Sequence, residues 1–319
     1  MMDRLKVAVV GAGAIGTFYG MMLEQAGADV SFVARGATLA AIRRDGLRIT
    51  GKRTRTIHPL VTDDPAQIDV VDAVLVCTKT FQVAPALEDY SSSLIGPDTV
   101  VVTTQNGVAT PQVVADIVGR RRTCPGVCRE WVKIVEPGVV DDMGGPASIH
   151  IGMLDDTQNP IVDEIRSRFE SVGVTCPPVD DITTELWFKA VNVCAQGAIG
   201  AALEATLGEL LTYHRDLFVR CVREWIAVGE AHGADFSPDV LAAVFAYFES
   251  QEDHLTTSFQ RDITAGRASE LEAQVGALPE LGDEVGVDTP LNDAFAAVLR
   301  AKAARAGHLS LIHISEPTR

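Results

Sequence analysis

The N-terminal part of the chain changes abruptly from apolar to glycine-rich and back to apolar. Residues 7–10 form a short β-branched run, which predicts a buried strand. Gly11, Gly13 and Gly16 follow at once, and apolar residues then recur at helical spacing up to Met22. This order predicts a strand, a tight turn and a helix, the unit that opens a dinucleotide-binding domain.

Each glycine has a separate expected role in this motif. Gly11 permits the tight turn, Gly13 lets the backbone approach a pyrophosphate, and Gly16 allows the helix to pack closely on the strand. The helix N-terminus offers unpaired N–H groups and a positive dipole end to the phosphates. A purely structural turn is the alternative, but the context favours a nucleotide site. The residues expected to bind the pyrophosphate are Gly11, Ala12, Gly13, Ala14, Ile15 and Gly16.

The same alternation continues for about half of the chain. Short apolar or alternating runs predict parallel strands, and amphipathic stretches between them predict helices. The expected strands cover residues 29–34, 47–50, 73–77, 99–103, 132–135, 147–151 and 174–176, and the expected helices cover residues 37–44 and 161–172. The basic run Arg120–Arg122 is expected to be a solvated loop.

Polar side chains follow three of these strands, where parallel sheets bind ligands. Arg35 stands where an NAD-binding protein carries an acidic residue, and a guanidinium suits the 2′-phosphate of NADP(H). Lys79 is a candidate phosphate or ribose contact, and Asn106 is a candidate residue of the ligand crevice. A solvated arginine, a solvated lysine and a turn asparagine are the respective alternatives.

From Asp181 the strand patterns disappear and helical periodicity dominates. Helices are expected over residues 181–204, 214–232, 238–249, 269–286 and 291–306. We therefore predict an α/β fold with an NADP-binding Rossmann-type domain over residues 1–178 and an all-helical substrate and catalytic domain over residues 179–308. Residues 309–319 continue no pattern and are expected to be a non-native tail.

Two polar features interrupt the helical half. Lys189 lies in an apolar helical segment, where desolvation lowers the pKa of a lysine toward that of a usable acid or base. Glu185 precedes it by four residues, so an exposed ion pair worth about 0.3 kcal/mol is the ordinary alternative. Polar residues also cluster from Thr256 to Glu272, which predicts a loop between helices with Ser269 as an N-cap.

Composition excludes several classes of function. The formal net charge of −16 argues against nucleic acid or an anionic membrane surface as a partner. No apolar run approaches a membrane span and no signal-peptide pattern precedes the first strand, so we expect a cytoplasmic protein. The six cysteines are scattered without metal-ligand spacing, which favours reduced structural thiols and no metal site.

Taken together, these landmarks resemble the ketopantoate (2-dehydropantoate) 2-reductase family over residues 5–305. The resemblance rests on the order and spacing of several short motifs rather than on any one of them. The matching segments are GAGAIG at 11–16, VARG at 33–36, CTKT at 77–80, QNG at 105–107, EPG at 136–138, ELWFK at 185–189, GEL at 208–210 and SFQRDITAGRASELE at 258–272.

The resemblance implies a site between a Rossmann domain and a helical domain. It implies that Arg35 and Lys79 contact NADPH, that Asn106 lies between nicotinamide and substrate, and that Lys189 is the general acid. Ser258 would contact the substrate, and Glu270 would lie near the nicotinamide ribose and orient the lysine. A dimer is expected only by analogy.

The chain departs from the family at the substrate pocket. Family members that reduce ketopantoate commonly carry asparagines where this chain has Val193, Gly197 and Leu207. Asn192 and Gln196 are one residue away and at helical spacing point elsewhere. The expected function is reduction of 2-dehydropantoate to pantoate with NADPH. The alternatives are a related reductase of another small-molecule 2-keto acid and a non-catalytic NADP(H)-binding protein.

Overall fold

The structure is a computed structural model that describes residues 4–307, and it divides into two compact units. The first unit runs to Gln105 and from Ala109 to Glu185, and the second contains Asn106–Val108 and the chain from Leu186 onward. The expected foreign tail, residues 309–319, lies outside the described residues. The two units are described separately below.

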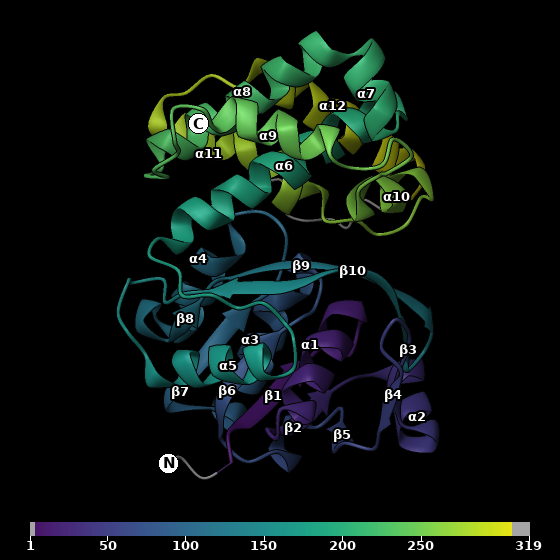
Figure 1. Cartoon of the computed structure of the whole chain (residues 1–319), viewed down its shortest axis with the longest axis vertical. Helices are drawn as coiled ribbons and strands as arrows, with labels where there is room; N and C mark the ends of the chain where they lie inside the picture. Colours follow the sequence, from purple (N-terminus) through teal and green to yellow (C-terminus); the bar gives the residue numbers. More distant parts are fainter. Residues whose placement is uncertain (1–3, 308–319) are drawn as a thin grey trace, which may run out of the picture. The chain divides into compact units, whose positions relative to one another are not determined.

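The first unit contains a six-stranded parallel sheet in the order β5-β2-β1-β6-β7-β8, visible in Figure 1. This order, in which the chain moves outward from β1 on one side and then restarts on the other, is that of a dinucleotide-binding domain. The predicted Rossmann-type fold is therefore confirmed. The strands are β1 (Lys6–Val10), β2 (Asp29–Val33), β5 (Val61–Thr62), β6 (Val71–Val76), β7 (Ile95–Thr103) and β8 (Thr123–Cys124).

Both faces of this sheet are buried, which explains why its strands are apolar without alternation. Val7 and Val9 of β1 point into a core with helices α1 and α5. Ala8 and Val10 point to the opposite face, into a second core with α3 and α4. The helices of this unit are α1 (Ala14–Gln25), α2 (Gly36–Asp45), α3 (Val83–Leu94), α4 (Thr110–Val118) and α5 (Pro160–Ser171).

A second, four-stranded sheet in the order β4-β3-β10-β9 packs into the α1 core. Its strands are β3 (Leu47–Gly51), β4 (Arg55–Ile57), β9 (Gly126–Glu136) and β10 (Val139–Ile151), and the last two form the long hairpin in Figure 1. The expected strands at 132–135 and 147–151 thus belong to a separate sheet. The expected strand at 174–176 is wrong, because only one bridge, Ser148 to Thr175, forms there.

Tyr19 connects helix α1 to this second sheet by hydrogen bonds. Its ring is fully buried, and its hydroxyl lies 2.7 Å from the carbonyl oxygen of Ser148 and also hydrogen-bonds the carboxyl group of Glu130. Burial raises the pKa of Tyr19 well above its ordinary value. The helix that follows the glycine turn is therefore held by polar contacts as well as by apolar packing.

The first turn of α6 (Ile182–Leu203) is anchored to the same sheet. The Glu185 carboxylate lies 3.2 Å from the Arg129 guanidinium and 3.0 Å from Nδ1 of His150. Ile182 packs on Gly152, where an added Cβ would be only 3.0 Å from the Ile182 Cβ. Glu185 therefore pairs with the strands β9 and β10, and the predicted ion pair with Lys189 is wrong.

The second unit is a bundle of helices around one apolar core that includes the buried Trp225. The Trp225 indole donates to the buried Asn292 side chain over 2.9 Å, so the polar atom of this large ring is satisfied. After α6, the helices are α7 (Leu207–Tyr213), α8 (Arg215–Ala231), α9 (Val240–Glu249), α10 (Ser258–Thr264), α11 (Ala277–Val285) and α12 (Pro290–Arg305).

Among residues 4–307, α6 alone is long and apolar enough to span a membrane by length and composition. Its apolar window is 67% buried inside the structure, as in the core helix of a water-soluble protein. It also carries Glu185 and Lys189. Its hydrophobicity is therefore explained by the core of the helical bundle.

The helical half differs from expectation in one region. The polar cluster predicted as a loop contains α10, whose first turn is capped by the Thr257 hydroxyl accepting from the Gln260 N–H. Ser269 caps no helix. The expected helix over 269–286 instead begins with a π-helical turn, Glu272–Gly276, and continues as α11. Short α7, which begins with a capping box formed by Thr206 and Glu209, is not among the expected helices.

The Glu185 contacts predict a pH-dependent contribution to stability. The hydrogen bond with His150 is the largest cause that lowers the pKa of Glu185 below its ordinary value, and the Arg129 charge adds to it. A lowered folded-state pKa stabilises the protein above the unfolded-state value, and this stabilisation is lost as the pH falls through the folded-state value. We expect Glu185→Gln to cost about 1 kcal/mol at neutral pH, since a third of the side chain is exposed.

Urea unfolding of the wild-type protein and of Glu185→Gln measures the difference in the free energy of unfolding. It is carried out at pH 7 and at the low-pH end of the range over which the stabilisation is lost. The cost should shrink at low pH, and Glu88→Gln, an exposed carboxylate of α3, serves as the control. An equal cost at both pH values would contradict the assignment.

Candidate functional site

The glycine turn of the first unit has the geometry of a pyrophosphate cradle. Gly11 has a φ of +105°, and a Cβ there would lie 3.0 Å from the backbone of Cys77 and Thr78. A Cβ on Gly16 would lie 2.1 Å from the Gly11 carbonyl oxygen. A Cβ on Gly13 would meet nothing within 4 Å. Gly11 and Gly16 are therefore required by the fold, whereas Gly13 faces open space.

The polar groups around this turn fit a bound dinucleotide. Helix α1 begins at Ala14, and no side chain caps its first turn, so its backbone N–H groups are available to phosphate oxygens. The Thr78 hydroxyl at the end of β6 is buried without a hydrogen-bond partner among the described residues. The sequence reasoning missed Thr78, although its position after a buried strand was a usable signal.

Arg35 and Lys79 lie at two strand ends of the same sheet edge. Arg35 is exposed at the start of α2, and its guanidinium hydrogen-bonds the Tyr90 hydroxyl and lies 3.5 Å from Asp89. The ion pair with Asp89 is exposed and contributes little, so a phosphate can replace it. Lys79 is half-buried at the start of the short turn Thr80–Gln82.

Lys189, Cys194 and Glu270 are neighbours in the second unit. The pKa of the Cys194 thiol is raised to about 12, mainly by burial. The Lys189 ammonium opposes this increase, and the Glu270 carboxylate adds to it. Lys189 is half-buried, and no hydrogen bond or ion pair joins its ammonium group to another residue within 4–307. The fold therefore presents an ammonium group that no carboxylate in the described chain neutralises by direct contact.

The π-helical turn positions Glu270 and the segment that contains Asn106. The fully buried Gln274 donates from Nε2 to a Glu270 carboxylate oxygen over 3.1 Å. A Cβ on Gly107, whose φ is +96°, would lie 2.6 Å from the Ala273 carbonyl oxygen, so Asn106–Val108 packs against this turn. Asn106 directly precedes Gly107 in the chain and is half-buried. π-Helical turns are frequent at functional sites.

Two of the three positions that differ from the family lie on the Lys189 face of α6. Val193 and Gly197 follow Lys189 at four-residue intervals, so they share its helix face. A Cβ on Gly197 would be 3.1 Å from Phe259 and from the Thr257 hydroxyl, so a larger residue here would have to displace one of these side chains. Leu207 is buried.

The remaining polar candidates of this unit have different environments. Ser258 is exposed at the start of α10. Asn192 is buried, donates to the Phe188 carbonyl oxygen over 2.6 Å, and has no partner for Oδ1 among the described residues.

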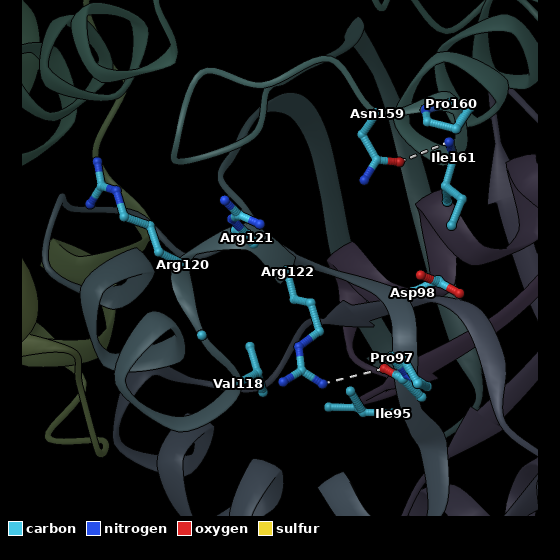
Figure 2. Close-up of a pocket in the computed structure, with 12 residues that line it drawn as sticks. Ile95, Pro97, Asp98, Val118, Arg120, Arg121, Arg122, Asn159, Pro160 and Ile161 are labelled. Carbon is cyan, nitrogen blue, oxygen red and sulfur yellow. Dashed lines mark hydrogen bonds between the residues drawn. The ribbon is translucent and has the colours of Figure 1, made fainter.

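A cavity of about 1050 Å³ lies elsewhere in the first unit (Figure 2). It is lined by the start of β7, the turn Arg120–Arg122 and the start of α5. The glycine cradle lies at the carboxyl ends of the parallel strands, whereas this cavity lies at their amino ends. The cavity therefore does not belong to the dinucleotide site.

The six cysteines are free thiols, and five of them are buried. Burial raises the pKa of Cys77 and Cys124 to about 12, which makes these thiols poor nucleophiles. Within residues 4–307, no three His, Cys, Asp or Glu side chains are grouped to hold a metal ion.

Alanine substitutions at Gly13 and Gly16 distinguish an effect on NADPH binding from an effect on folding stability. We expect Gly13→Ala to keep the free energy of unfolding within about 0.5 kcal/mol, because its Cβ enters open space. The same variant should weaken NADPH binding at least about tenfold by occupying the pyrophosphate position. Gly16→Ala should cost about 1–3 kcal/mol of stability, because its Cβ overlaps the Gly11 carbonyl.

Urea unfolding and fluorescence titration with NADPH measure the two effects. Unchanged NADPH affinity in a stable Gly13→Ala protein would remove the cradle assignment.

Comparison with known proteins assigns the family. Residues 7–156 match the model of "Ketopantoate reductase PanE/ApbA", and residues 181–303 match the model of its C-terminal part. A 2-dehydropantoate 2-reductase from Caulobacter vibrioides is 30% identical over 302 residues, covering 93% of this chain and 99% of the relative. The enzyme of the same name from Pyrococcus horikoshii is 27% identical over 305 residues, covering 95% and 99%.

Solved structures show the same architecture. The crystal structure of a 2-dehydropantoate 2-reductase from Geobacter metallireducens superposes with a TM-score of 0.85 at 27% identity, covering 93% of this chain and 99% of that one. A D-mandelate dehydrogenase with NADH and anilino(oxo)acetate shares the fold at 22% identity, with a TM-score of 0.85 and coverage of 95% and 99%. The chain belongs to the ketopantoate reductase family, whose members are NAD(P)H-dependent oxidoreductases of keto acids and 2-hydroxy acids.

Proposed function

We propose that this protein reduces a 2-keto acid to a 2-hydroxy acid with NADPH, and that the substrate is 2-dehydropantoate. The observation that carries this proposal is the state of Lys189. The carboxylate expected to neutralise it, Glu185, is bound instead by Arg129 and His150. The ammonium group remains available for a substrate, in a unit where Glu270 lies near it.

The proposed cofactor site uses residues of the first unit. Backbone N–H groups from Gly13 to Gly16 would bind the pyrophosphate, and Thr78 and Lys79 would contact the phosphates or the ribose. Arg35 would bind the 2′-phosphate in place of Asp89, which favours NADPH over NADH. When bound, the nicotinamide supplies the hydride for the keto carbon.

The proposed chemistry of the second unit is proton donation and charge stabilisation. Reduction of a ketone places negative charge on its oxygen, and the Lys189 ammonium would stabilise this charge and donate the proton. Glu270, held by Gln274, would keep the ammonium oriented. Asn106 and Ser258 would hydrogen-bond the substrate.

A second candidate is a reductase of a different, more apolar 2-keto acid. Val193 and Gly197 offer no side-chain hydrogen bond on the Lys189 face, and a larger residue at Gly197 would have to displace the Phe259 or Thr257 side chain. Burying a substrate hydroxyl without a partner costs about 1–3 kcal/mol. Ketopantoate carries such a hydroxyl, so these positions favour an analogue that lacks it. A non-catalytic NADP(H)-binding protein is the remaining alternative.

Oxidation of NADPH with a panel of 2-keto acids tests these functions. The informative pair is ketopantoate and 3,3-dimethyl-2-oxobutanoate, which differ only by the hydroxyl group. A higher kcat/KM for ketopantoate supports the proposed substrate, and a higher value for the analogue selects the second candidate. Cofactor binding without turnover of any keto acid would identify a binding protein.

Lys189→Ala tests the proposed general acid. We expect kcat to fall by about 10²–10⁴-fold, because the proton donor and the charge on the oxygen are lost together. The Kd for NADPH should change less than threefold in this variant, as an order-of-magnitude limit. Lys302→Ala, which removes an ammonium paired with Glu204, is the matched control. A variant that retains wild-type kcat would refute the role.

Arg35→Ala tests the choice of cofactor. We expect affinity for NADPH to fall by roughly tenfold or more while affinity for NADH stays nearly constant, because only NADPH carries the 2′-phosphate. Arg43→Ala on the same helix, where Arg43 pairs with Asp63, is the control. Equal losses for the two cofactors in a titration would contradict the assignment.

A further inference from the structure

The cavity at the amino end of β7 is a second concave site in the first unit. Its lining combines apolar residues with three consecutive arginines, on a single 3-10 turn between α4 and β8. Its volume of about 1050 Å³ is large enough for a nucleotide-sized molecule. The apolar part consists of Ile95, Pro97, Val118, Pro160 and Ile161.

The positive charge of this cavity is not neutralised by direct ion pairs. Arg120 donates to the Leu154 carbonyl oxygen over 2.8 Å, and Arg122 donates to the Gly96 carbonyl oxygen over 3.3 Å. A carbonyl orients a guanidinium without cancelling its charge and leaves most of its five N–H donors unused. Within residues 4–307, none of the three guanidinium groups forms an ion pair with a carboxylate.

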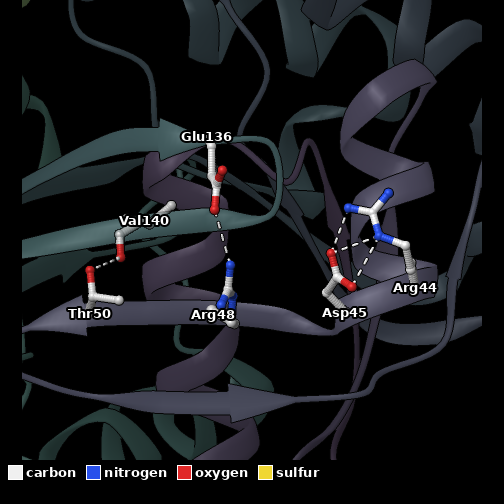
Figure 3. Close-up of polar contacts among 6 residues, drawn as sticks. All are labelled: Arg44, Asp45, Arg48, Thr50, Glu136 and Val140. Carbon is white, nitrogen blue, oxygen red and sulfur yellow. Dashed lines mark hydrogen bonds and ion pairs between the residues drawn. The ribbon is translucent and has the colours of Figure 1, made fainter.

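Most other arginines of the same unit pair with a carboxylate, although Arg4 also donates only to carbonyl oxygens. In Figure 3, Arg44 pairs with Asp45, and Arg48 pairs with Glu136 at 3.1 Å. The protein has a formal charge of −16, so carboxylates are abundant. Three adjacent arginines without a direct carboxylate partner are therefore an exception that charge balance alone does not explain.

Other polar groups of the cavity complete its chemistry. Figure 2 shows Arg122 extending toward the segment at Pro97, where it donates to the Gly96 carbonyl oxygen, whereas Arg120 points away from the other labelled residues. The Asn159 oxygen caps α5, which leaves its amide N–H groups as further donors. Two carboxylates reduce the positive potential of the cavity. Asp98 lines the cavity. The hydrogen bond from the Thr157 hydroxyl is the main cause that lowers the pKa of Asp155, and the nearby Arg121 charge adds slightly to this effect.

We propose that this cavity binds a nucleoside diphosphate or a similar phosphate ester. Arg121 and Arg122 would bind the phosphate oxygens, since a guanidinium fork matches their geometry. The apolar wall would pack against the planar organic part, and Asp98 would accept a hydrogen bond from a hydroxyl or amino group. This site is separate from the dinucleotide cradle: β7 (Ile95–Thr103) alone spans about 26 Å between the two edges of the sheet.

Calorimetric titration of the full chain with uridine 5′-diphosphate, in the presence of saturating NADP⁺, tests the proposal. We expect a Kd below about 1 mM at roughly physiological ionic strength. The double variant Arg121→Gln/Arg122→Gln should weaken binding at least about tenfold. Arg121→Gln alone should also weaken it, and this variant leaves the Arg122 contact with Gly96 intact.

The double variant Arg44→Gln/Arg48→Gln removes the same charge from a surface outside the cavity and is the matched control. It should change the Kd less than about twofold. No detectable binding, equal loss in the control, or displacement by NADP⁺ would overturn the site. Equal affinity for inorganic pyrophosphate would overturn the part of the proposal that assigns the apolar wall to an organic group.

Discussion

The close approach of helix α1 to the first two central strands is the constraint on which the first unit depends. The Gly11 carbonyl lies where a Cβ of Gly16 would be, and Cys77 at the end of β6 packs against the same turn. Larger residues would push the helix away from the sheet and move its N-terminal N–H groups. The proposed pyrophosphate cradle is therefore a consequence of tight packing. The open space beside Gly13 is the one feature of the glycine turn that this packing does not require.

A second arrangement of charges leaves the Lys189 ammonium without a direct carboxylate partner among the described residues. Glu185 would be the natural partner of Lys189 on an isolated helix, but Arg129 and His150 bind it. Glu270 is in turn held by the buried Gln274 on the π-helical turn. Under the proposed function, these contacts would keep the half-buried Lys189 ammonium available to the charge that develops on the substrate oxygen.

Substrate choice depends on smaller energies than the fold does. One unpaired hydroxyl costs about 1–3 kcal/mol, which is enough to change selectivity tenfold or more while leaving the reductase framework unchanged. Under the proposed function, the residues at 193, 197 and 207 would act on this scale.

The sequence by itself determined the glycine turn, the central apolar strands and the change to a helical second half, because these depend on local periodicity and on backbone conformations that few residues adopt. It did not determine helices α3, α4 and α10, the π-helical turn, or the pairing of β3, β9 and β10 in a separate sheet, which depends on contacts between segments distant in sequence. Only the tertiary structure decided which carboxylate pairs with which cation. Glu185 turns from Lys189 to Arg129 and His150 because strands distant in sequence bring two cations to it, and no spacing along a single helix contains that information.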